Sequence, residues 1–530
     1  MPQRKSDAAE PPTAHAQSVR HLGACEWGAL VLLPILSVAH ILVVARTFGI
    51  GLAPDSANYI AAAESFAQGH GLRGYTGDPL TLWPPLYPLL LGLPRLAGVP
   101  PVSTSLVLSA ACFGLVTLLA GVWIARYVRH FWLALLGQAL VATSPSMVLV
   151  CRYAFSEPPL VVFTLLFLMI ACHRLERGTG GYGILGVLLC MAAATTKYVG
   201  VALPLTGALL LLLPVSSPFS RHGTLRQRGW RSGVFLFASV APLGVWIVRN
   251  YLVSGTLAGA RSENRYSVAE QLNALLQMLS QSLSPVPGVA KLGFVGMALV
   301  LAAAICVGVS SSKAKPPAAR VLPPALFCAI YLLLFLVSVR STNLDLIWKR
   351  HLAPLYPPLV YLVLLYADAA LGAERLPSAR VARWCLLVVA LLHLPLWFRS
   401  LLRDTRQMAE RGIGWYSTPQ WRESPLVRHL AGSAPPGRLY SNYPDVVYLT
   451  TGRYCRLSPV DYRANRWFRA FSPQDLEPSL MQTRRSGEPS SLVWFDDSFR
   501  TYLVPVERLR TQLPLRQEAS FPDGAVYSIP

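Results

Sequence analysis

The sequence predicts a polytopic α-helical membrane protein with about eleven transmembrane helices, within a range of roughly 11 to 13, and a soluble C-terminal α/β domain. Three observations support this fold class. The 530 residues are 53% hydrophobic and 14% charged, with a mean hydropathy of +0.42, as is typical of membrane proteins. Long apolar runs recur up to about residue 400. Beyond them the chain becomes rich in Arg, Pro and Tyr and contains short β-type runs.

The apolar runs are about as long as the ~17 to 25 helical residues that cross a bilayer. They lie near 27–50, 105–125, 131–150, 157–173, 181–196, 199–215, 233–252, 292–310, 321–339, 352–371 and 384–399. The first run exceeds the ~7 to 15 residues of a secretory signal core, so we expect a retained anchor. The sequence thus predicts an N-terminal segment at 1–26 and a transmembrane domain at 27–400.

Basic residues predict the topology. If the N-terminus is cytoplasmic, the loops on that side hold most of the Lys and Arg between spans, at 4–20, 126–129, 174–177, 221–231, 313–320 and 375–383. This distribution follows the positive-inside rule and accounts for most of the net charge of +21, so we expect no nucleic-acid partner. The first outer loop (51–104) and the C-terminal domain (401–530) then lie outside, as do the loops around Glu157 and Lys197.

Two outer segments are predicted to form helices in the interface plane. In the first outer loop, Ser56–Gln68 has a helical pattern with Ser56 as its cap, and Trp83–Pro88 is an irregular approach to a second helix. Apolar residues recur at helical spacing between Val268 and Leu283, with polar residues between them.

Short alternating runs predict the elements of the C-terminal domain. We expect strands at Arg438–Asn442 and Ser491–Phe495, helices at Asp445–Thr451 and Tyr502–Leu513, and a hairpin turn at Pro522–Gly524. Together these elements predict a small α/β domain.

Carboxylates at the outer edge of the membrane are the candidate catalytic groups. Asp55 follows the first span, and Glu157 precedes two prolines at the start of another. A role as helix cap explains Asp55 equally well from residue type alone. Glu64 fits a solvated helix position and Asp78 a turn. Asp55, Asp78 and Glu157 could also hold a divalent cation, although their spacing is not diagnostic of a metal site.

Cations in the outer loops are candidate ligands of a phosphate. They are Lys197, Arg261, Arg265, Arg350 and His351. Such residues often anchor a protein at the lipid head groups. Their position on the side where Lys and Arg are usually depleted favours an anionic ligand instead.

Four motifs together resemble the GT-C superfamily of integral-membrane glycosyltransferases. They are the Asp after the first span, WPPLYPLLLGL (Trp83–Leu93), RYAFSEPP (Arg152–Pro159) and KRHLAPLYPPLVYL (Lys349–Leu362). More narrowly, they resemble the protein O-mannosyltransferase and lipid A aminoarabinose transferase group. The run YSNYPDVVYLTTGRYCRLSP (Tyr440–Pro459) is similar to the soluble tails of bacterial members.

The resemblance implies a function in cell-envelope glycosylation. It implies inverting transfer of a hexosyl or pentosyl group from a polyprenyl-phosphate-linked donor to a lipid, glycan or protein acceptor, outside a bacterial inner membrane. By position, Asp55 matches a first-loop Asp that acts as general base or orients the acceptor, and Glu157 matches a second-loop acid. Lys197, Arg265 and Arg350, and more weakly Arg261 and His351, match donor-phosphate ligands. The chain departs from the mannosyltransferases at Ser56, where those enzymes have an Asp-Glu pair.

Two alternatives fit the same composition. A multi-span transporter or flippase of a lipid-linked or anionic substrate would also place charged groups at the membrane edge. Such transporters often contain internal repeats and broken helices in symmetric positions, and the sequence has no evident repeat. A catalytically inactive scaffold of the same fold is the other alternative.

Overall fold

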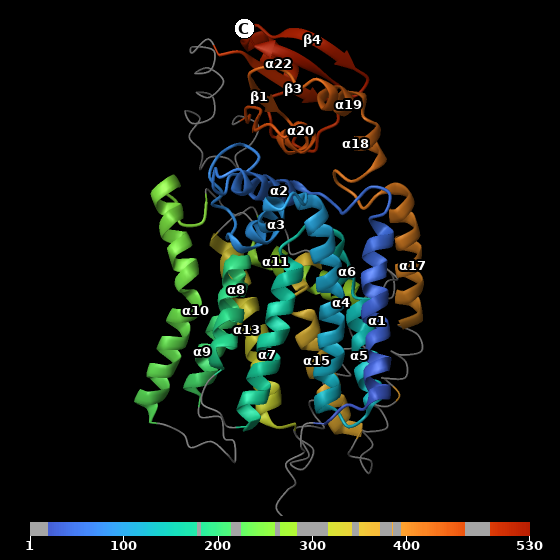
Figure 1. Cartoon of the computed structure of the whole chain (residues 1–530), viewed down its shortest axis with the longest axis vertical. Coiled ribbons are helices and arrows are strands. Elements are labelled where there is room, and N and C mark those ends of the chain that lie inside the picture. The colour runs from blue at the N-terminus through green and yellow to red at the C-terminus, as the bar shows by residue number, and fades with distance from the viewer. Residues whose placement is uncertain are drawn as a thin grey trace, which may run out of the picture.

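The computed structural model describes residues 20–177, 182–213, 224–259, 266–283, 316–341, 349–371, 384, 394–461 and 488–529. A bundle of roughly parallel helices forms the body of the molecule, and a small sheet domain lies at one end of it (Figure 1). Two helices of the first outer loop, α2 (Pro54–Ala67) and α3 (Leu86–Leu96), lie between the body and the sheet domain (Figure 1).

The helical body makes the protein an integral membrane protein. Its helices are α1 (Ala24–Val44), α4 (Pro101–Tyr127), α5 (Phe131–Ala142), α6 (Pro145–Arg152), α7 (Glu157–Arg177), α8 (Gly183–Thr196), α9 (Ala202–Leu212), α10 (Leu225–Ser254), α13 (Ala318–Ser341) and α15 (Tyr356–Leu371). Within the described residues, five helices are long and apolar enough to cross a membrane, or six if the bent α5 and α6 form one span. The predicted run at 292–310 and most of 384–399 lie outside the described residues.

The predicted run at 131–150 is a broken helix. Ser144 accepts a hydrogen bond from the Met147 amide, and Pro145 occupies the first turn of α6. A side-chain cap followed by proline starts a new helix, so α5 and α6 meet at 49°. α6 ends at Arg152. The chain from Tyr153 onward lies at the end of the body that faces the sheet domain.

The first outer loop contains the predicted helix, but its cap is different. The prediction that Ser56 caps the helix is wrong, because α2 begins at Pro54 and Ala53 is the N-cap. Ser56 Oγ instead accepts a hydrogen bond from the Ala53 amide at 3.1 Å. Proline at the first helical position is already suited to this start, since it lacks the N–H that would stay unpaired there.

Aromatic rings and one ion pair join α2 to α3. The ring of Tyr59 contacts Tyr87 and Trp83 edge-on, at centroid distances of 4.9 and 5.6 Å. Glu64 lies in the helix as predicted, with its side chain 24% exposed, and its carboxylate pairs with Arg95 at 2.8 Å. These contacts fix the position of α2, which carries Asp55.

The sheet domain follows α17 (Leu394–Arg411), which packs beside α1. This helix runs through residue 401, where the sequence predicts that the C-terminal domain begins. Its five strands lie in the order β2-β1-β3-β5-β4. They are β1 (Arg438–Ser441), β2 (Cys455–Leu457), β3 (Ser490–Phe495), β4 (Arg516–Phe521) and β5 (Gly524–Ile529), with helices α18 (Pro419–Glu423), α19 (Pro425–Gly432), α20 (Pro444–Thr451) and α22 (Val506–Gln512). β1 is parallel to β2 and β3, whereas β5 is antiparallel to β3 and β4. The two predicted strands, the helix at Asp445–Thr451 and the final hairpin are confirmed. The second predicted helix begins at Val506 and not at Tyr502, and β2, α18 and α19 were not predicted.

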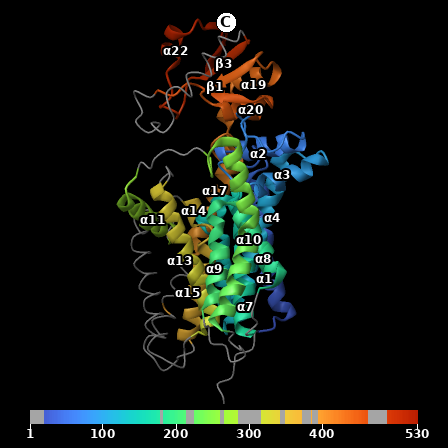
Figure 2. The same cartoon turned by 90° about the vertical axis from the view of Figure 1, so that its left-hand side faces the viewer.

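The amphipathic segment after α10 is helical, as predicted. It forms α11 (Val268–Leu283), which packs against α13. Ala274 contacts Phe335 in this junction, whereas Leu272 and Leu276 are exposed. Figure 2 shows α11 beside the end of α13 that faces the sheet domain. Its position in a membrane interface stays a prediction.

Candidate active site

A short backbone bridge brings the two candidate carboxylates together. The Gly51 amide donates to the Arg152 carbonyl at 2.9 Å, and the Ala154 amide donates to the Gly51 carbonyl at 3.0 Å. The chains at Gly51 and Tyr153 are thus paired in parallel. Asp55 follows Gly51 by the same number of residues as Glu157 follows Tyr153. Because Gly51 and Tyr153 are paired in parallel, Asp55 and Glu157 lie on the same side of this bridge.

Close packing around position 51 requires glycine there. A Cβ atom at Gly51 would lie 2.6 Å from the ring of Tyr153 and 2.9 Å from Ile413 Cγ2. The Tyr153 hydroxyl in turn donates to the Ile413 carbonyl at 3.0 Å. The segment before Asp55 is therefore held between the segment before Glu157 and the linker that leads into the sheet domain.

Asp55 forms an ion pair with a predicted phosphate ligand. Its Oδ2 accepts a hydrogen bond from Arg350 Nη1 at 2.9 Å. Arg350 lies on the short helix α14 (Lys349–Leu352), with its guanidinium 5.5 Å from the centre of the Phe155 ring. The Asp55 side chain is 30% exposed, so a small molecule can reach this carboxylate.

Glu157 forms the second ion pair, with Lys197. Its side chain is only 4% exposed. Arg350 also interacts electrostatically with Glu157 and so connects the two pairs. Two carboxylates and two cations from four separate segments, Asp55, Glu157, Lys197 and Arg350, thus form one compact group in which the charges balance.

The other predicted ligands have different positions. His351 lies next to Arg350, where its ring centroid is 5.0 Å from that of Phe335 and its carbonyl accepts from the Tyr331 hydroxyl at 3.1 Å. Arg261 and Arg265 lie outside the described residues.

Asp78 lies in a turn, as predicted. Its carboxylate accepts a hydrogen bond from Thr76 Oγ1 at 2.9 Å in an exposed loop. Across the described residues, no group of three or more His, Cys, Asp or Glu side chains is placed to hold a metal ion. Asp55, Asp78 and Glu157 do not form such a group.

Comparison with known proteins identifies the fold. No family model matches the chain, and no curated protein sequence matches it. The structure of ArnT from Cupriavidus metallidurans in the apo state matches with a TM-score of 0.61 and 15% identity, over 95% of this chain and 98% of ArnT. The same protein bound to undecaprenyl phosphate matches with a TM-score of 0.61 and 16% identity, over 96% of this chain and 98% of ArnT. The chain has the GT-C fold. The fold that the sequence motifs predict is thus confirmed over nearly the whole length.

A half-buried chain of polar contacts in the GT-C body was not predicted. Arg152 Nε donates to His40 Nε2 at 3.1 Å, and His40 Nδ1 lies 2.9 Å from Thr405 Oγ1. These contacts connect α6, α1 and α17, and α17 leads into the sheet domain. A histidine in the first apolar run was the available signal, because polar residues inside membrane helices usually have a specific role.

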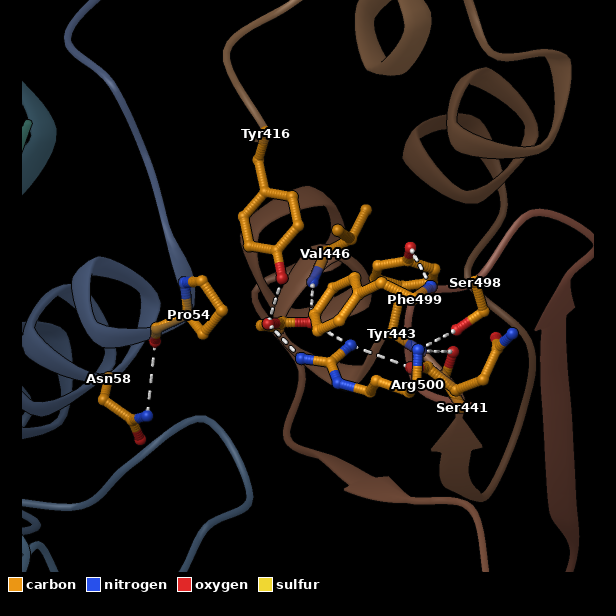
Figure 3. A network of polar contacts seen from close by, with 11 residues as sticks. Pro54, Asn58, Tyr416, Ser441, Tyr443, Val446, Ser498, Phe499 and Arg500 are labelled. Atoms are coloured by element: carbon orange, nitrogen blue, oxygen red, sulfur yellow. Dashed lines mark hydrogen bonds and ion pairs between the residues drawn. The ribbon is translucent and has the colours of Figure 1, made fainter. Parts of the chain in front are cut away.

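A second unpredicted network lies where the sheet domain meets the first outer loop. Asp445, which is fully buried, accepts hydrogen bonds from Arg500 Nη2 at 2.7 Å and from the Tyr416 hydroxyl. Figure 3 shows Tyr416 and Arg500 with Tyr443 on one side and the first turn of α2, at Pro54, on the other. Burial and the nearby Asp445 carboxylate raise the pKa of the Tyr416 phenol well above its usual range, so Tyr416 stays a neutral donor.

Backbone contacts continue this connection. The Tyr416 amide donates to the Leu52 carbonyl at 3.0 Å, and the Leu52 amide donates to Ser417 Oγ at 3.1 Å. Farther along the loop, the Cys455 amide donates to the Tyr75 carbonyl at 2.9 Å. The sheet domain is therefore bonded to the loop on both sides of α2.

Proposed function

We propose that the protein is an inverting glycosyltransferase that moves a hexosyl or pentosyl group from a polyprenyl-phosphate-linked donor to a lipid, glycan or protein acceptor. The observation that carries this proposal is the paired contact of Asp55 with Arg350 and of Glu157 with Lys197, beneath the sheet domain of a GT-C body. The ArnT structure with undecaprenyl phosphate supports the class of donor, since that protein has the same fold.

Asp55 is the proposed base. An acceptor hydroxyl must reach the carboxylate that removes its proton, and Asp55 is 30% exposed whereas Glu157 is 4% exposed. Glu157 instead holds Lys197 and Arg350 in place. A carboxylate that orients cations has a positioning role and does not need contact with the acceptor.

Lys197 and Arg350 are the proposed ligands of the donor phosphate. The acceptor oxygen attacks the anomeric carbon while the bond from that carbon to the phosphate oxygen breaks, and the acceptor proton passes to Asp55. The bonding electrons leave with the polyprenyl phosphate, whose added negative charge the two cations stabilise. A single displacement of this kind inverts the anomeric carbon. Arg261, Arg265 and His351 remain proposed additional ligands.

The proposed orientation puts the sheet domain on the extracytoplasmic side of a bacterial inner membrane and the N-terminal segment, 1–26, in the cytoplasm. The transmembrane domain is assigned to 27–400 and the outer domain to 401–530. Support comes from basic residues at the end of the body opposite the sheet domain, such as Arg126 at the end of α4 and Arg226 at the start of α10.

The test compares Asp55→Asn with Asp78→Asn in purified protein reconstituted into liposomes. Radiolabelled undecaprenyl-phosphate hexoses and pentoses are the donors, a membrane extract supplies acceptors, and the release of undecaprenyl phosphate is measured. Asp55→Asn should lower the rate by about 10²- to 10⁴-fold, because a positioned base contributes that much. Asp78→Asn removes a carboxylate from the same loop at an exposed turn and should retain full activity.

Two results would reject the proposal. Full turnover by Asp55→Asn would remove the base from the mechanism. Passage of the intact lipid-linked sugar across the liposome membrane, with no release of undecaprenyl phosphate, would make the protein a flippase.

A further inference from the structure

Helix α10 lies at the outer edge of the GT-C body, next to α8 and α9 (Figure 1). Only 22% of its most apolar stretch is buried, the lowest share among the five long apolar helices of the described chain. Its C-terminal end contacts the first outer loop, where Arg249 Nη1 donates to the Leu80 carbonyl at 2.6 Å. Its N-terminal end therefore lies at the end of the body opposite the sheet domain.

An apolar groove opens at that N-terminal end. It has a volume of about 480 Å³ and is bounded by the start of α8, the end of α9 and one face of α10. Its apolar lining consists of Tyr182, Ile184, Val187, Leu188, Leu211, Trp230, Val234 and Phe235. We call it the α10 groove. Trp230 is 74% exposed at its edge, a position that tryptophan often occupies at a membrane interface.

Arg231 lines the α10 groove, whereas Arg226 lines the hollow next to it. Arg231 and Trp230 line both the groove and a second hollow that continues along α10 past Arg226. Arg228 lies between Arg226 and Arg231 in the sequence. Its Nη1 donates to the Leu212 carbonyl at 3.0 Å, so this arginine holds the end of α9. Arg226 and Arg231 are exposed and form no ion pair with any carboxylate of the described residues.

We propose that the α10 groove binds one anionic phospholipid, with its phosphate on Arg226 and Arg231 and one acyl chain against the apolar lining. Guanidinium groups suit a phosphate because they donate paired hydrogen bonds to it. Two unpaired cations favour a lipid with net negative charge over a zwitterionic lipid, whose own ammonium group offsets the phosphate. The opposite end of the body contains the proposed catalytic group, so this site is separate from sugar transfer.

Trp230 provides the probe for the test. The purified full chain in detergent is titrated with phosphatidylglycerol or phosphatidylcholine brominated on the acyl chains, since bromine quenches a tryptophan that it contacts. The Trp230 signal is the difference from Trp230→Phe. Phosphatidylglycerol should quench it at a lower concentration than phosphatidylcholine, and unbrominated phosphatidylglycerol should restore it.

The arginines are tested against a matched control. Arg226→Gln and Arg231→Gln should each lower the preference for phosphatidylglycerol by about 5-fold, the usual effect of one basic residue near an anionic lipid surface. Arg126→Gln removes the same charge at the same end of the body, outside the groove, and should leave the preference unchanged. Each variant is compared with the parent protein in thermal midpoint, so that a folding defect is recognised.

Three outcomes would overturn the proposal. Equal quenching by the two lipids would mean that the groove accepts any acyl chain. An equal loss in Arg126→Gln and Arg231→Gln would mean general attraction to the anionic lipid. The third outcome combines two observations: neither lipid quenches Trp230, and the protein has the mass of a dimer in solution. It would mean that a second copy of the chain covers the groove. No sugar transfer is measured, so failure here leaves the proposed function untouched.

Discussion

At the residue scale, the pair Glu157–Lys197 combines a buried carboxylate with a cation that is still 25% exposed. Lys197→Met should lower the free energy of unfolding by about 3 kcal/mol, because it removes the bonded partner of a buried charge. Glu157→Gln should cost less, since the Lys197 ammonium can turn toward water. The double variant should recover part of the loss. Denaturant unfolding in detergent micelles measures all three.

A surface ion pair provides the control for these variants. Arg406 and Glu410 lie 3.2 Å apart on α17, with side chains 84% and 56% exposed. Arg406→Gln should change the free energy of unfolding by less than about 0.5 kcal/mol, since exposed pairs contribute little. Additive losses in the Glu157→Gln, Lys197→Met double variant would contradict the interpretation of a coupled buried pair.

The sequence could indicate candidate residues but could not pair them. Asp55 and Glu157 stand out because each carboxylate is at the end of an apolar run, and Lys197 and Arg350 because they are cations in loops predicted to lie on the outer side. Arg350 and Asp55 are 295 positions apart in the chain, and no local pattern predicts such a contact. The partner of Glu64 was not predicted for the same reason, since Arg95 belongs to another helix.

At the element scale, the bridge at Gly51 determines where α2 and α7 begin relative to each other. Gly51→Ala places a methyl group within 2.6 Å of the Tyr153 ring and 2.9 Å of Ile413. The segments must then move apart, which we expect to cost about 1 to 3 kcal/mol of stability. Gly51→Ala should also lower the rate of undecaprenyl phosphate release by more than the loss of stability explains, because Asp55 shifts relative to Glu157.

The control is a glycine in the preceding helix. Gly28 lies in α1, and a Cβ atom there would meet no atom within 4 Å. Gly28→Ala should be neutral or slightly stabilising, as alanine favours a helix by roughly 1 kcal/mol over glycine. A stable, fully active Gly51→Ala protein would show that the bridge does not position the carboxylates.

Elements with strong local signals were predicted well, and elements set by packing were not. The hairpin at Pro522–Gly524 and the helix at Val268–Leu283 follow from turn residues and helical periodicity. The break at Ser144–Pro145 was hidden inside a continuous apolar run, because hydropathy does not distinguish one straight helix from two bent ones. The strand Cys455–Leu457 is three residues long and depends on pairing with β1.

At the scale of the whole molecule, the change in composition near residue 400 predicted a separate α/β domain but not its attachment to the body. That attachment depends on contacts between distant segments: Tyr416 with Leu52, and Cys455 with Tyr75. No local pattern in the sequence pairs Asp445 with Arg500, which is 55 positions later in the chain. Their burial is a property of the folded domain, in which the carboxylate is fully covered.

Arg500 provides a test of whether the sheet domain holds the first outer loop in place. Arg500→Met leaves the Asp445 carboxylate buried without its cation and should cost about 3 to 5 kcal/mol. Hydrogen exchange should then speed up at the amides of Tyr416 and Cys455, which donate to carbonyls of the loop. Arg516→Met is the control, because Arg516 is 82% exposed and its ion pair with Glu518 is long, at 3.8 Å. If exchange at both amides stays at the parent rate while the domain loses stability, the loop keeps its position without the network, and the sheet domain has no part in positioning Asp55.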